Sequence, residues 1–320
     1  MIKTIYLAGG CFWGLQKLMK EIKGVVHSTA GYANGTGQAD ANYQKVCSGK
    51  TGFREAVRVD YDPAEVDLAA LLHMFFYVID PEAVNQQGND VGSQYQSGIY
   101  YDAADEEAEE TVLQLSAIER ERYQHFAVEI KPIENFFDAE DYHQDYLDKN
   151  QGGYCHISPK KMKEARAMLV NPGNYRRPDN PKEIKERLSK EQYYVTQESG
   201  TEPPFKNVYW DHFEKGIYVD VVTGEPLFSS YDKFNSSCGW PAFSRPIEDL
   251  SMVEKRDRSF GMIRTEVRSR AGNSHLGHVF EGERESPNSI RYCINSAALR
   301  FIPFEKMEEE GYGYLKGIFK

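Results

Sequence analysis

The chain has 320 residues, of which 40% are hydrophobic and 27% are charged, and its formal net charge is −11 at pH 7. This length predicts about two globular domains. The charge excludes nucleic acid as a partner, because nucleic-acid-binding proteins need a basic surface. An acidic surface also gives no attraction to anionic membranes, and no apolar run reaches the ~18 residues that a membrane span needs.

Strands and helices are expected to alternate in the first half. Apolar or alternating runs predict strands at residues 5–8, 56–61, 97–101 and 128–132. Helical spacing of apolar residues and capping signals predict helices at residues 12–23, 63–75, 105–122, 139–148 and 159–170. A glycine-rich stretch at 31–37 and a polar stretch at 80–95 are expected to be loops. This alternation predicts an α/β domain.

The composition changes at residues 171–181, which are rich in proline and polar side chains. Such a stretch is typical of a linker, and a short charged helix is expected after it at 182–190. The rest of the chain contains short expected strands between turn residues, at 217–222, 261–267, 278–280 and 299–302. This pattern predicts a second, β-rich domain.

The cysteines are few and odd in number: Cys11, Cys47, Cys155, Cys238 and Cys293. An odd, sparse set in a chain of this length does not form a disulfide framework, and no two of them are spaced as C-x-x-C. Sparse, unpaired cysteines are typical of a reducing compartment, where thiols are retained for chemistry. We therefore expect a cytoplasmic protein.

Cys11 lies between an expected strand and an expected helix, in the sequence Gly9–Gly14. The free N–H groups and the dipole at a helix N-terminus favour a thiolate, which is the nucleophilic form of cysteine. Phe12 and Trp13 follow directly and would form an apolar wall. The alternative is structural, because a lone cysteine after a strand is more often a small buried hydrophobe.

Other candidates in the first half are weak one by one. They are Tyr43, Glu55 at the start of a strand, Asp90 and Tyr95 in the long polar stretch, and Cys155 in a glycine-flanked segment. A surface glutamate is commonly only solvated, and a tyrosine commonly belongs to the core.

Together with the sequence around Cys11, these residues fall in motifs that resemble the A-type peptide-methionine sulfoxide reductases. The matching segments are residues 10–13, 31–32, 47–49, 51–52, 55, 87–99 and 139–144, in the family order, and the similarity covers about residues 3 to 160. The resemblance implies an α+β sandwich with a ferredoxin-like core and extra helices. It also implies that Cys11 is the nucleophile that attacks the sulfoxide sulfur.

The departing oxygen of a sulfoxide needs a proton, and the resemblance places Glu55 beside Cys11 as the donor. To donate near neutral pH, this carboxyl should be held uncharged by a dry pocket. The resemblance further implies that Tyr43 and Tyr95 bind the oxygen, that Asp90 supports the loop that contains Tyr95, and that Phe12 and Trp13 hold the S-methyl group. Cys155 would then attack the sulfenic acid on Cys11. Cys47 has no assigned role and is expected to be a buried structural thiol.

The second half contains Cys238, Cys293, His275 and His278. Two histidines and two cysteines are a possible zinc site, and a cysteine–histidine pair is also typical of a hydrolase. The residue pattern alone leaves both possibilities open.

Several motifs of the second half resemble the B-type methionine sulfoxide reductases. They are residues 192–197, 200–205, 227–228, 239–241, 264–267, 275–280 and 291–295, and they cover about residues 190 to 305. The resemblance implies a mainly β domain of two antiparallel sheets, barrel-like, with Cys293 as nucleophile and Cys238 as resolving thiol. It gives His278 the proton or polarising role, with His275 and Asn295 organising the site and Trp240 packing on the methyl group. Arg291, two residues before Cys293, would favour the thiolate electrostatically. Glu281 is the candidate for the supporting carboxylate.

Many B-type members bind a structural zinc through two C-x-x-C pairs. The matching positions here are Asp220, Thr223, Ser269 and Gly272, which cannot form a thiolate site. We therefore expect no metal.

The sequence thus predicts a fusion, with an A-type domain at residues 1–170, a linker at 171–189, a B-type domain at 190–312 and a tail at 313–320. The expected activity is thioredoxin-dependent reduction of methionine sulfoxide in protein repair, the S epimer in the first domain and the R epimer in the second, without a cofactor. One alternative is a redox-regulated binding module with inert sites. Another is a metal-dependent cysteine/histidine hydrolase.

Overall fold

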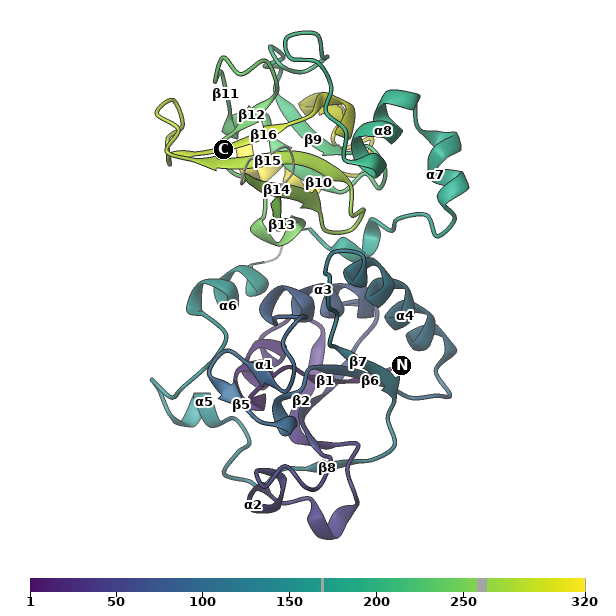
Figure 1. Cartoon of the computed structure of the whole chain (residues 1–320), viewed down its shortest axis with the longest axis vertical. Helices are drawn as coiled ribbons and strands as arrows, with labels where there is room; N and C mark the ends of the chain where they lie inside the picture. Colours follow the sequence, from purple (N-terminus) through teal and green to yellow (C-terminus); the bar gives the residue numbers. More distant parts are fainter. Residues whose placement is uncertain (168–169, 258–263, 320) are drawn as a thin grey trace. The chain divides into compact units, whose positions relative to one another are not determined.

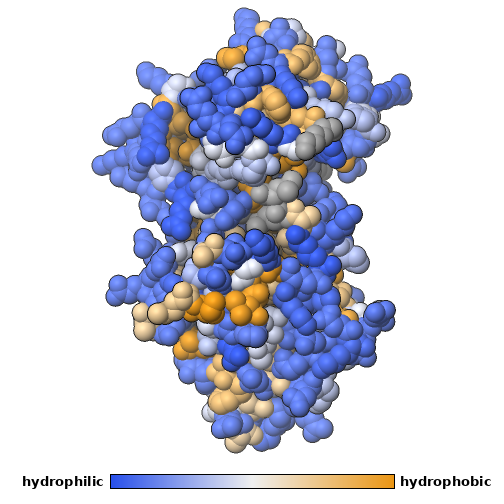
Figure 2. Space-filling view, turned by 180° about the vertical axis from the view of Figure 1, so that it is seen from behind, coloured by the Kyte–Doolittle hydropathy of each residue, from blue (hydrophilic) through white to orange (hydrophobic). Residues whose placement is uncertain are grey.

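The computed structural model describes residues 1–167, 170–257 and 264–319. The chain divides into two compact units, Met1–Ala167 and Met168–Lys320 (Figure 1). None of the described helices is both long and apolar enough to cross a membrane. On the face shown in Figure 2, hydrophilic side chains cover most of the surface.

The first unit contains a six-stranded sheet in the order β7-β6-β1-β3-β2-β8. The described strands are β1 (Lys3–Ala8), β2 (Val25–Ala33), β3 (Arg54–Tyr61), β4 (Gln86–Gln87), β5 (Asp90–Val91), β6 (Gly98–Tyr101), β7 (Glu129–Pro132) and β8 (Phe136–Asp138). The described helices are α1 (Phe12–Lys20), α2 (Tyr43–Val46), α3 (Leu68–Val78), α4 (Glu106–Arg120), α5 (Tyr146–Lys149) and α6 (Pro159–Arg166), with 3₁₀ turns η1 (Gln38–Asp40) and η2 (Ser93–Tyr95). β4 and β5 pair with each other in a separate two-stranded sheet.

The centre of this unit has the connectivity β1-α1-β2-β3-α3-β6, with its strands in the order β6-β1-β3-β2. This is the arrangement of a split β-α-β unit. All its pairings are antiparallel, whereas the outer pair β6–β7 is parallel. Ile5 and Leu7 of β1 are fully buried, as are Leu71 and Phe75 of α3, so the core lies between this sheet and its helices.

Residues 31–33 belong to β2, although the sequence predicted a loop from residue 31 to 37. Because Gly31 has no side chain, the backbone and an aromatic ring of the neighbouring strand can pack directly against it. A Cβ atom at Gly31 would lie 2.3 Å from the ring of Phe136 and 2.5 Å from the carbonyl of Phe137. The loop prediction was therefore wrong for these three residues.

The helix predicted at 139–148 is reduced to Tyr146–Lys149. Asp145 has a φ of +53°, which no α-helix accommodates. The preceding residues are instead tied to the sheet, because the Gln144 side chain pairs with both the N–H and the carbonyl of Ala30. These tertiary hydrogen bonds replace helical ones.

The second unit begins with 3₁₀ turn η3 (Pro172–Asn174) and two helices, α7 (Pro181–Arg187) and α8 (Lys190–Glu198). Its described strands are β9 (Gly216–Asp220), β10 (Pro226–Ser229), β11 (Lys233–Phe234), β12 (Ala242–Phe243), β13 (Met252–Asp257), β14 (Arg264–Ser269), β15 (His275–Glu281), β16 (Ile290–Ile294) and β17 (Leu299–Pro303). Further 3₁₀ turns are η4 (Ser230–Asp232), η5 (Asp249–Ser251), η7 (Ser296–Ala298), η8 (Phe304–Lys306) and η9 (Gly313–Phe319).

These strands form two antiparallel sheets, one of three strands in the order β10-β9-β17 and one of six in the order β11-β12-β16-β15-β14-β13. Within the described residues no pairing closes either sheet, so the barrel-like closure expected from the sequence is not observed there. The strand expected at 261–267 begins outside the described residues, and its described part starts at Arg264.

The core of the second unit is rich in aromatic rings, with Phe228 and Phe243 stacked at 4.4 Å between their centroids. Val195 of α8 is buried in the same cluster. The sequence analysis did not predict α8, although Ser189 and Gln192 form a capping box at its start. Leu315, in the stretch expected to be a tail, is buried in a second cluster that includes Met307.

Candidate active sites

Cys11 is the N-cap residue of α1 and lies in the tight turn that follows β1. Gly10 in this turn has a φ of +84°, and a Cβ atom there would lie 2.6 Å from Gln87. Glycine is therefore required both by the backbone conformation and by the close approach of the loop that contains Gln87. The Cys11 side chain is 6% exposed.

Glu55 lies on β3 and reaches the same helix terminus. Its Oε2 accepts a hydrogen bond from the backbone N–H of Phe12 at 3.2 Å. Its Oε1 is buried, and none of the described groups hydrogen-bonds to it. Burial raises the pKa of Glu55 to about 8, although the Phe12 N–H opposes this shift. Glu55 is therefore largely a neutral acid at pH 7.

The thiolate expected at Cys11 is not favoured in this resting geometry. Burial raises the pKa of Cys11 well above its ordinary value, and the negative charge of Glu55 would raise it further. The backbone N–H of Trp13 lowers the pKa, but its effect is smaller than that of burial. The prediction from the helix terminus alone was thus wrong, because desolvation outweighs the helix terminus in this dry site.

Tyr43, Tyr95 and Asp90 come from α2, η2 and β5, and the fold brings them to the same region. Burial raises the pKa of both phenols, and charges at Glu55 and Cys11 add to this effect. The phenols of Tyr43 and Tyr95 therefore stay protonated and can act as hydrogen-bond donors. Burial also raises the pKa of the Asp90 carboxyl, whereas a hydrogen bond from Tyr154 lowers it.

Cys47 differs from the prediction, because its thiol is exposed rather than buried. It lies at the C-terminus of α2, and it shares a hydrogen bond with the Tyr43 side chain that contributes to the raised pKa of Tyr43. The helix α2 is about one turn long, so its sequence pattern could not indicate which of its side chains face solvent.

Trp13 is fixed by two residues that the sequence analysis did not single out. Its indole N–H donates to Nδ1 of His143 at 3.1 Å, and its ring stacks on Tyr146 with centroids 3.7 Å apart. The centroid of Phe12 lies 5.1 Å from that of His143. An aromatic pocket thus adjoins Cys11, and the Ala139–Gln144 motif was the available signal for it.

Cys155 lies beside the same helical turn. A Cβ atom at Gly14, three residues after Cys11, would lie 2.7 Å from the Cys155 sulfur. The sequence placed this thiol in a glycine-flanked segment, and in the structure its sulfur packs against α1.

In the second unit, strand register places the expected site residues together. His278 on β15 lies directly opposite Cys293 on β16, and Ala242 of β12 flanks Cys293 on the other side. Residues directly opposite each other in an antiparallel pair project to the same face. Cys293 and His278 therefore share one face of the sheet.

The sulfurs of Cys238 and Cys293 are 3.6 Å apart, and one thiol donates to the other. The hydrogen bond from Cys293 is the main cause that lowers the pKa of Cys238 to about 5, with Ser236 contributing. The same bond, together with burial, raises the pKa of Cys293. The two sulfurs therefore share one proton near neutral pH, and the positive charge of Arg291 stabilises the shared negative charge.

Each histidine is paired with a carboxylate from a neighbouring strand. His278 Nε2 lies 2.9 Å from Asp257 Oδ2, and His275 Nδ1 lies 2.7 Å from Glu266 Oε1. Glu281, the expected supporting carboxylate, is exposed and pairs with neither histidine. The expectation was wrong because β15 alternates its faces, so that Glu281 projects away from the face that His278 shares with Cys293.

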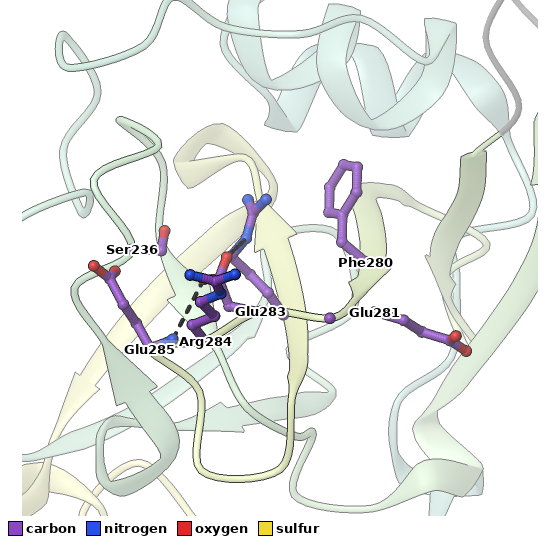
Figure 3. Close-up of a pocket in the computed structure, with 8 residues that line it drawn as sticks. Ser236, Phe280, Glu281, Glu283, Arg284 and Glu285 are labelled. Atoms are coloured by element: carbon purple, nitrogen blue, oxygen red, sulfur yellow. Dashed lines mark hydrogen bonds and ion pairs between the residues drawn. The ribbon is translucent and has the colours of Figure 1, made fainter.

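The second unit has a pocket of about 520 Å³ (Figure 3). One of its lining residues, Ser236, donates a hydrogen bond to the Cys238 sulfur at 2.9 Å, and Glu281 extends away from Ser236. Its described lining residues are Ser236, Phe280, Glu281, Gly282, Glu283, Arg284, Glu285 and Arg291. The guanidinium of Arg291 is fixed by Glu283 at 2.7 Å and lies over the Phe280 ring.

Trp240 and Asn295 complete the expected set. The indole N–H of Trp240 donates to the carbonyl of Glu202 at 3.0 Å. The Asn295 side chain is buried and joins the carbonyl of Leu276 to the N–H of Glu202. Asn295 therefore ties the loop of Glu202 to β15 and has no described contact with either sulfur.

Comparison with protein-family models identifies the family to which each domain belongs. Residues 3–171 match the model of peptide methionine sulfoxide reductase, and residues 188–303 match the SelR domain. The chain belongs to the peptide methionine sulfoxide reductase family. It is an oxidoreductase in which an A-type domain is joined to a B-type, SelR domain.

Solved structures of relatives match the first half of this reductase. Mxr1 from Saccharomyces cerevisiae in reduced form is 36% identical over 49% of this chain and 91% of its own, with a TM-score of 0.46. Methionine sulfoxide reductase A of Corynebacterium diphtheriae is 35% identical over 48% of this chain and 77% of its own, with a TM-score of 0.43. Mxr1 in complex with Trx2 is 28% identical over 45% of this chain and 84% of its own, with a TM-score of 0.32.

In the reductase's second domain, the positions that carry zinc-binding cysteines in many B-type members are close in space. Ser269 donates to Asp220 at 2.5 Å, and a Cβ atom at Gly272 would lie 2.4 Å from that carboxylate. Asp220 is fully buried and also accepts from Ser274 and from the backbone N–H of Val222. This donor set does not fit zinc, which prefers thiolate and imidazole in such sites. Among the residues that the structure describes, no group of three or more metal-ligating side chains occurs.

Proposed function

We propose that each domain of this reductase works on one epimer of methionine sulfoxide, the S epimer in the first domain and the R epimer in the second. One observation carries this proposal. Each unit places a second cysteine and a proton-holding side chain around a cysteine that is buried in the first unit and half-buried in the second, on two unrelated folds. Two differently built sites suit two substrates of opposite handedness at sulfur.

In the first domain, Cys11 attacks the sulfoxide sulfur while Glu55 supplies a proton to the oxygen. The oxygen and the proton from Glu55 become the hydroxyl of a sulfenic acid on Cys11, and methionine leaves. Because the Cys11 thiol is neutral in the resting site, its own proton passes to Glu55 and restores the neutral acid. Tyr43 and Tyr95 donate hydrogen bonds to the oxygen, and Asp90 supports the loop that carries Tyr95.

The aromatic pocket of this domain holds the methyl group on the reacting sulfur. Phe12 and Trp13 form its walls, and the pairing of Trp13 with His143 and Tyr146 supports its shape. Such walls discriminate epimers, because the methyl group and the oxygen would exchange places in the opposite epimer.

In the second domain, Cys293 is the nucleophile and Cys238 is the resolving thiol. The contact between the two sulfurs lets Cys238 accept the Cys293 proton as Cys293 attacks. His278, held by Asp257, polarises or protonates the oxygen, His275 and Asn295 organise the site, and Arg291 favours the thiolate through its positive charge. Trp240 packs on the methyl group.

Both cycles close through an intradomain disulfide, in which Cys155 or Cys238 displaces the hydroxyl of the sulfenic acid as water. A dithiol must then reduce this disulfide, and we propose that thioredoxin or a similar protein does so, with no other cofactor. None of the five cysteines is disulfide-bonded in the structure, which suits a reducing compartment such as the cytoplasm.

The test is turnover of each pure epimer with reduced thioredoxin. We expect the intact chain to reduce both epimers, with S turnover dependent on Cys11 and R turnover dependent on Cys293. Turnover of one epimer by both sites, or of neither by one of them, would overturn the two-site assignment.

A further inference from the structure

The segment that carries Cys155 lies against the turn that carries Cys11. Gly152 and Gly153 precede it, and Cys155 packs its sulfur against Gly14 of α1. His156, the next residue, has a side chain that is only 3% exposed. A buried histidine next to a reacting thiol has no place in the reaction outlined above.

Three glycines form the seat of the His156 side chain. A Cβ atom at Gly10 would lie 3.2 Å from Nε2, one at Gly14 would lie 3.6 Å from Cε1, and one at Gly88 would lie 3.4 Å from the Cβ of His156. Gly10 and Gly14 flank Cys11 in the chain, whereas Gly88 connects β4 to β5. The imidazole thus joins the nucleophile's turn to the loop of Asp90.

Close packing surrounds this ring, and it has few polar contacts. No hydrogen bond of good geometry joins either ring nitrogen to a described protein group: the Gly9 carbonyl is near enough to affect the pKa of the ring, and the Asp90 carboxylate is 3.9 Å from Nδ1. Burial lowers the pKa of His156 to about 4, against a smaller opposing effect of the Gly9 carbonyl. The ring is therefore neutral at neutral pH and acts in its seat as a filler of defined shape.

Cys155 is held on its other side as well. The phenol of Tyr154 shares a hydrogen bond with Asp90, and it would be 4.0 Å from a Cβ atom at Gly88. The residues before and after Cys155 are therefore both anchored to the loop that contains Gly88 and Asp90. A thiol between two anchors is held in place despite the flexible glycines that precede it.

We propose that His156 is a positioning residue for the second chemical step, which holds the Cys155 thiol beside the first turn of α1. This inference rests on the proposed function of the first domain. In that step the Cys155 sulfur attacks the sulfur of the Cys11 sulfenic acid, and the S–S bond forms as the S–O bond breaks. The hydroxyl leaves with the Cys155 proton as water, so no external oxidant or reductant is needed.

Two substitutions separate the shape of the ring from its nitrogens. His156→Ala empties the seat, whereas His156→Leu refills it with an apolar side chain of similar size. The measurement is a single turnover with the S epimer and no reductant, in which methionine release reports the first step. The second step, disulfide formation, is followed by the loss of free thiols and by trapping the remaining sulfenic acid with dimedone. His27→Ala, at an exposed histidine of β2, is the matched control.

We expect His156→Ala to slow disulfide formation about tenfold or more and to let trappable sulfenic acid accumulate, because a misplaced group reacts far more slowly. Methionine release should stay within about twofold of the wild type, and His156→Leu should form the disulfide within about threefold of it. An unchanged disulfide rate in His156→Ala would overturn the proposal, as would equal defects in the two variants.

The proposed function fails in a different way. If the wild-type chain released no methionine from the S epimer, the function itself would be wrong. If His156→Ala lost methionine release because the domain is damaged, the disulfide rate of His156→Leu would decide the outcome.

Discussion

The backbone N–H of Phe12 donates to the Glu55 carboxyl at 3.2 Å, so the expected acid is fixed to the first residue of the helix that begins at Cys11. One hydrogen bond thereby joins a sheet strand to the nucleophile's turn. The second carboxyl oxygen stays buried without a described partner, where it can reach a substrate oxygen.

Because the pKa of Glu55 is raised to about 8, the acid is protonated below that pH and loses its proton as the pH rises. We therefore expect the rate of methionine release from the S epimer to be highest below pH 8 and to fall above it. Glu55→Gln should lower this rate about 100-fold or more, the usual effect of losing a general acid. Single-turnover rates between pH 6 and pH 10 (roughly two units on either side of that pKa) would test this. A Glu55→Gln variant that keeps the wild-type pH profile would contradict the assignment.

The two nucleophiles are expected to act independently. Cys11→Ser should abolish reduction of the S epimer and leave R turnover within about twofold, because a serine hydroxyl is a far weaker nucleophile than a cysteine. Cys293→Ser should do the reverse. Cys47→Ser is the matched control, since this exposed thiol has no assigned role. Loss of both activities in either single variant would refute two separate sites.

The resolving thiols should control the recycling of each site. Cys155→Ser and Cys238→Ser are each expected to release about one methionine per site and then stop when thioredoxin is the reductant. The initial burst and the later steady rate can be measured in one time course per epimer. Sustained thioredoxin-driven turnover in either variant would remove that cysteine from the cycle.

In the second site, Asp257 should matter more than Glu281. Asp257 holds the His278 ring at 2.9 Å, whereas none of the hydrogen bonds or ion pairs among the described residues joins Glu281 to either histidine. We expect Asp257→Asn to lower R turnover about tenfold or more and Glu281→Gln to leave it within about twofold, because only the first disturbs the orientation of an acid–base group. S turnover in both variants serves as the internal control. Equal losses from the two substitutions would contradict this arrangement.

Asp220 should stabilise the second domain. Its carboxylate is fully buried and accepts from Ser269, from Ser274 and from the Val222 N–H. Asp220→Ala would leave these donors unpaired and is expected to cost about 2–4 kcal/mol of unfolding free energy. Urea unfolding of the second domain, with the exposed Glu309→Ala as control, measures the difference. A loss below about 0.5 kcal/mol, the range of ordinary surface changes, would show that the cluster is not stabilising.

The sequence by itself determined the two-part organisation, the alternation of the first half and the β-rich second half, because these depend on local periodicity and turn residues. It also singled out Cys11 and Cys293, since the motifs around them are contiguous. Asp257 and Glu266 were not assigned to the histidines, because only the pairing of β13, β14 and β15 brings them there.

Tertiary structure alone decided the charge state and the surroundings of the sulfurs. The helix terminus predicted a thiolate at Cys11, but the pKa depends on how much water the whole fold excludes, and burial raises it. Likewise, only the folded chain brings Gly10, Gly14 and Gly88 together around His156. Contacts between distant segments and the dryness that they create are properties of the packed chain, which no local pattern encodes.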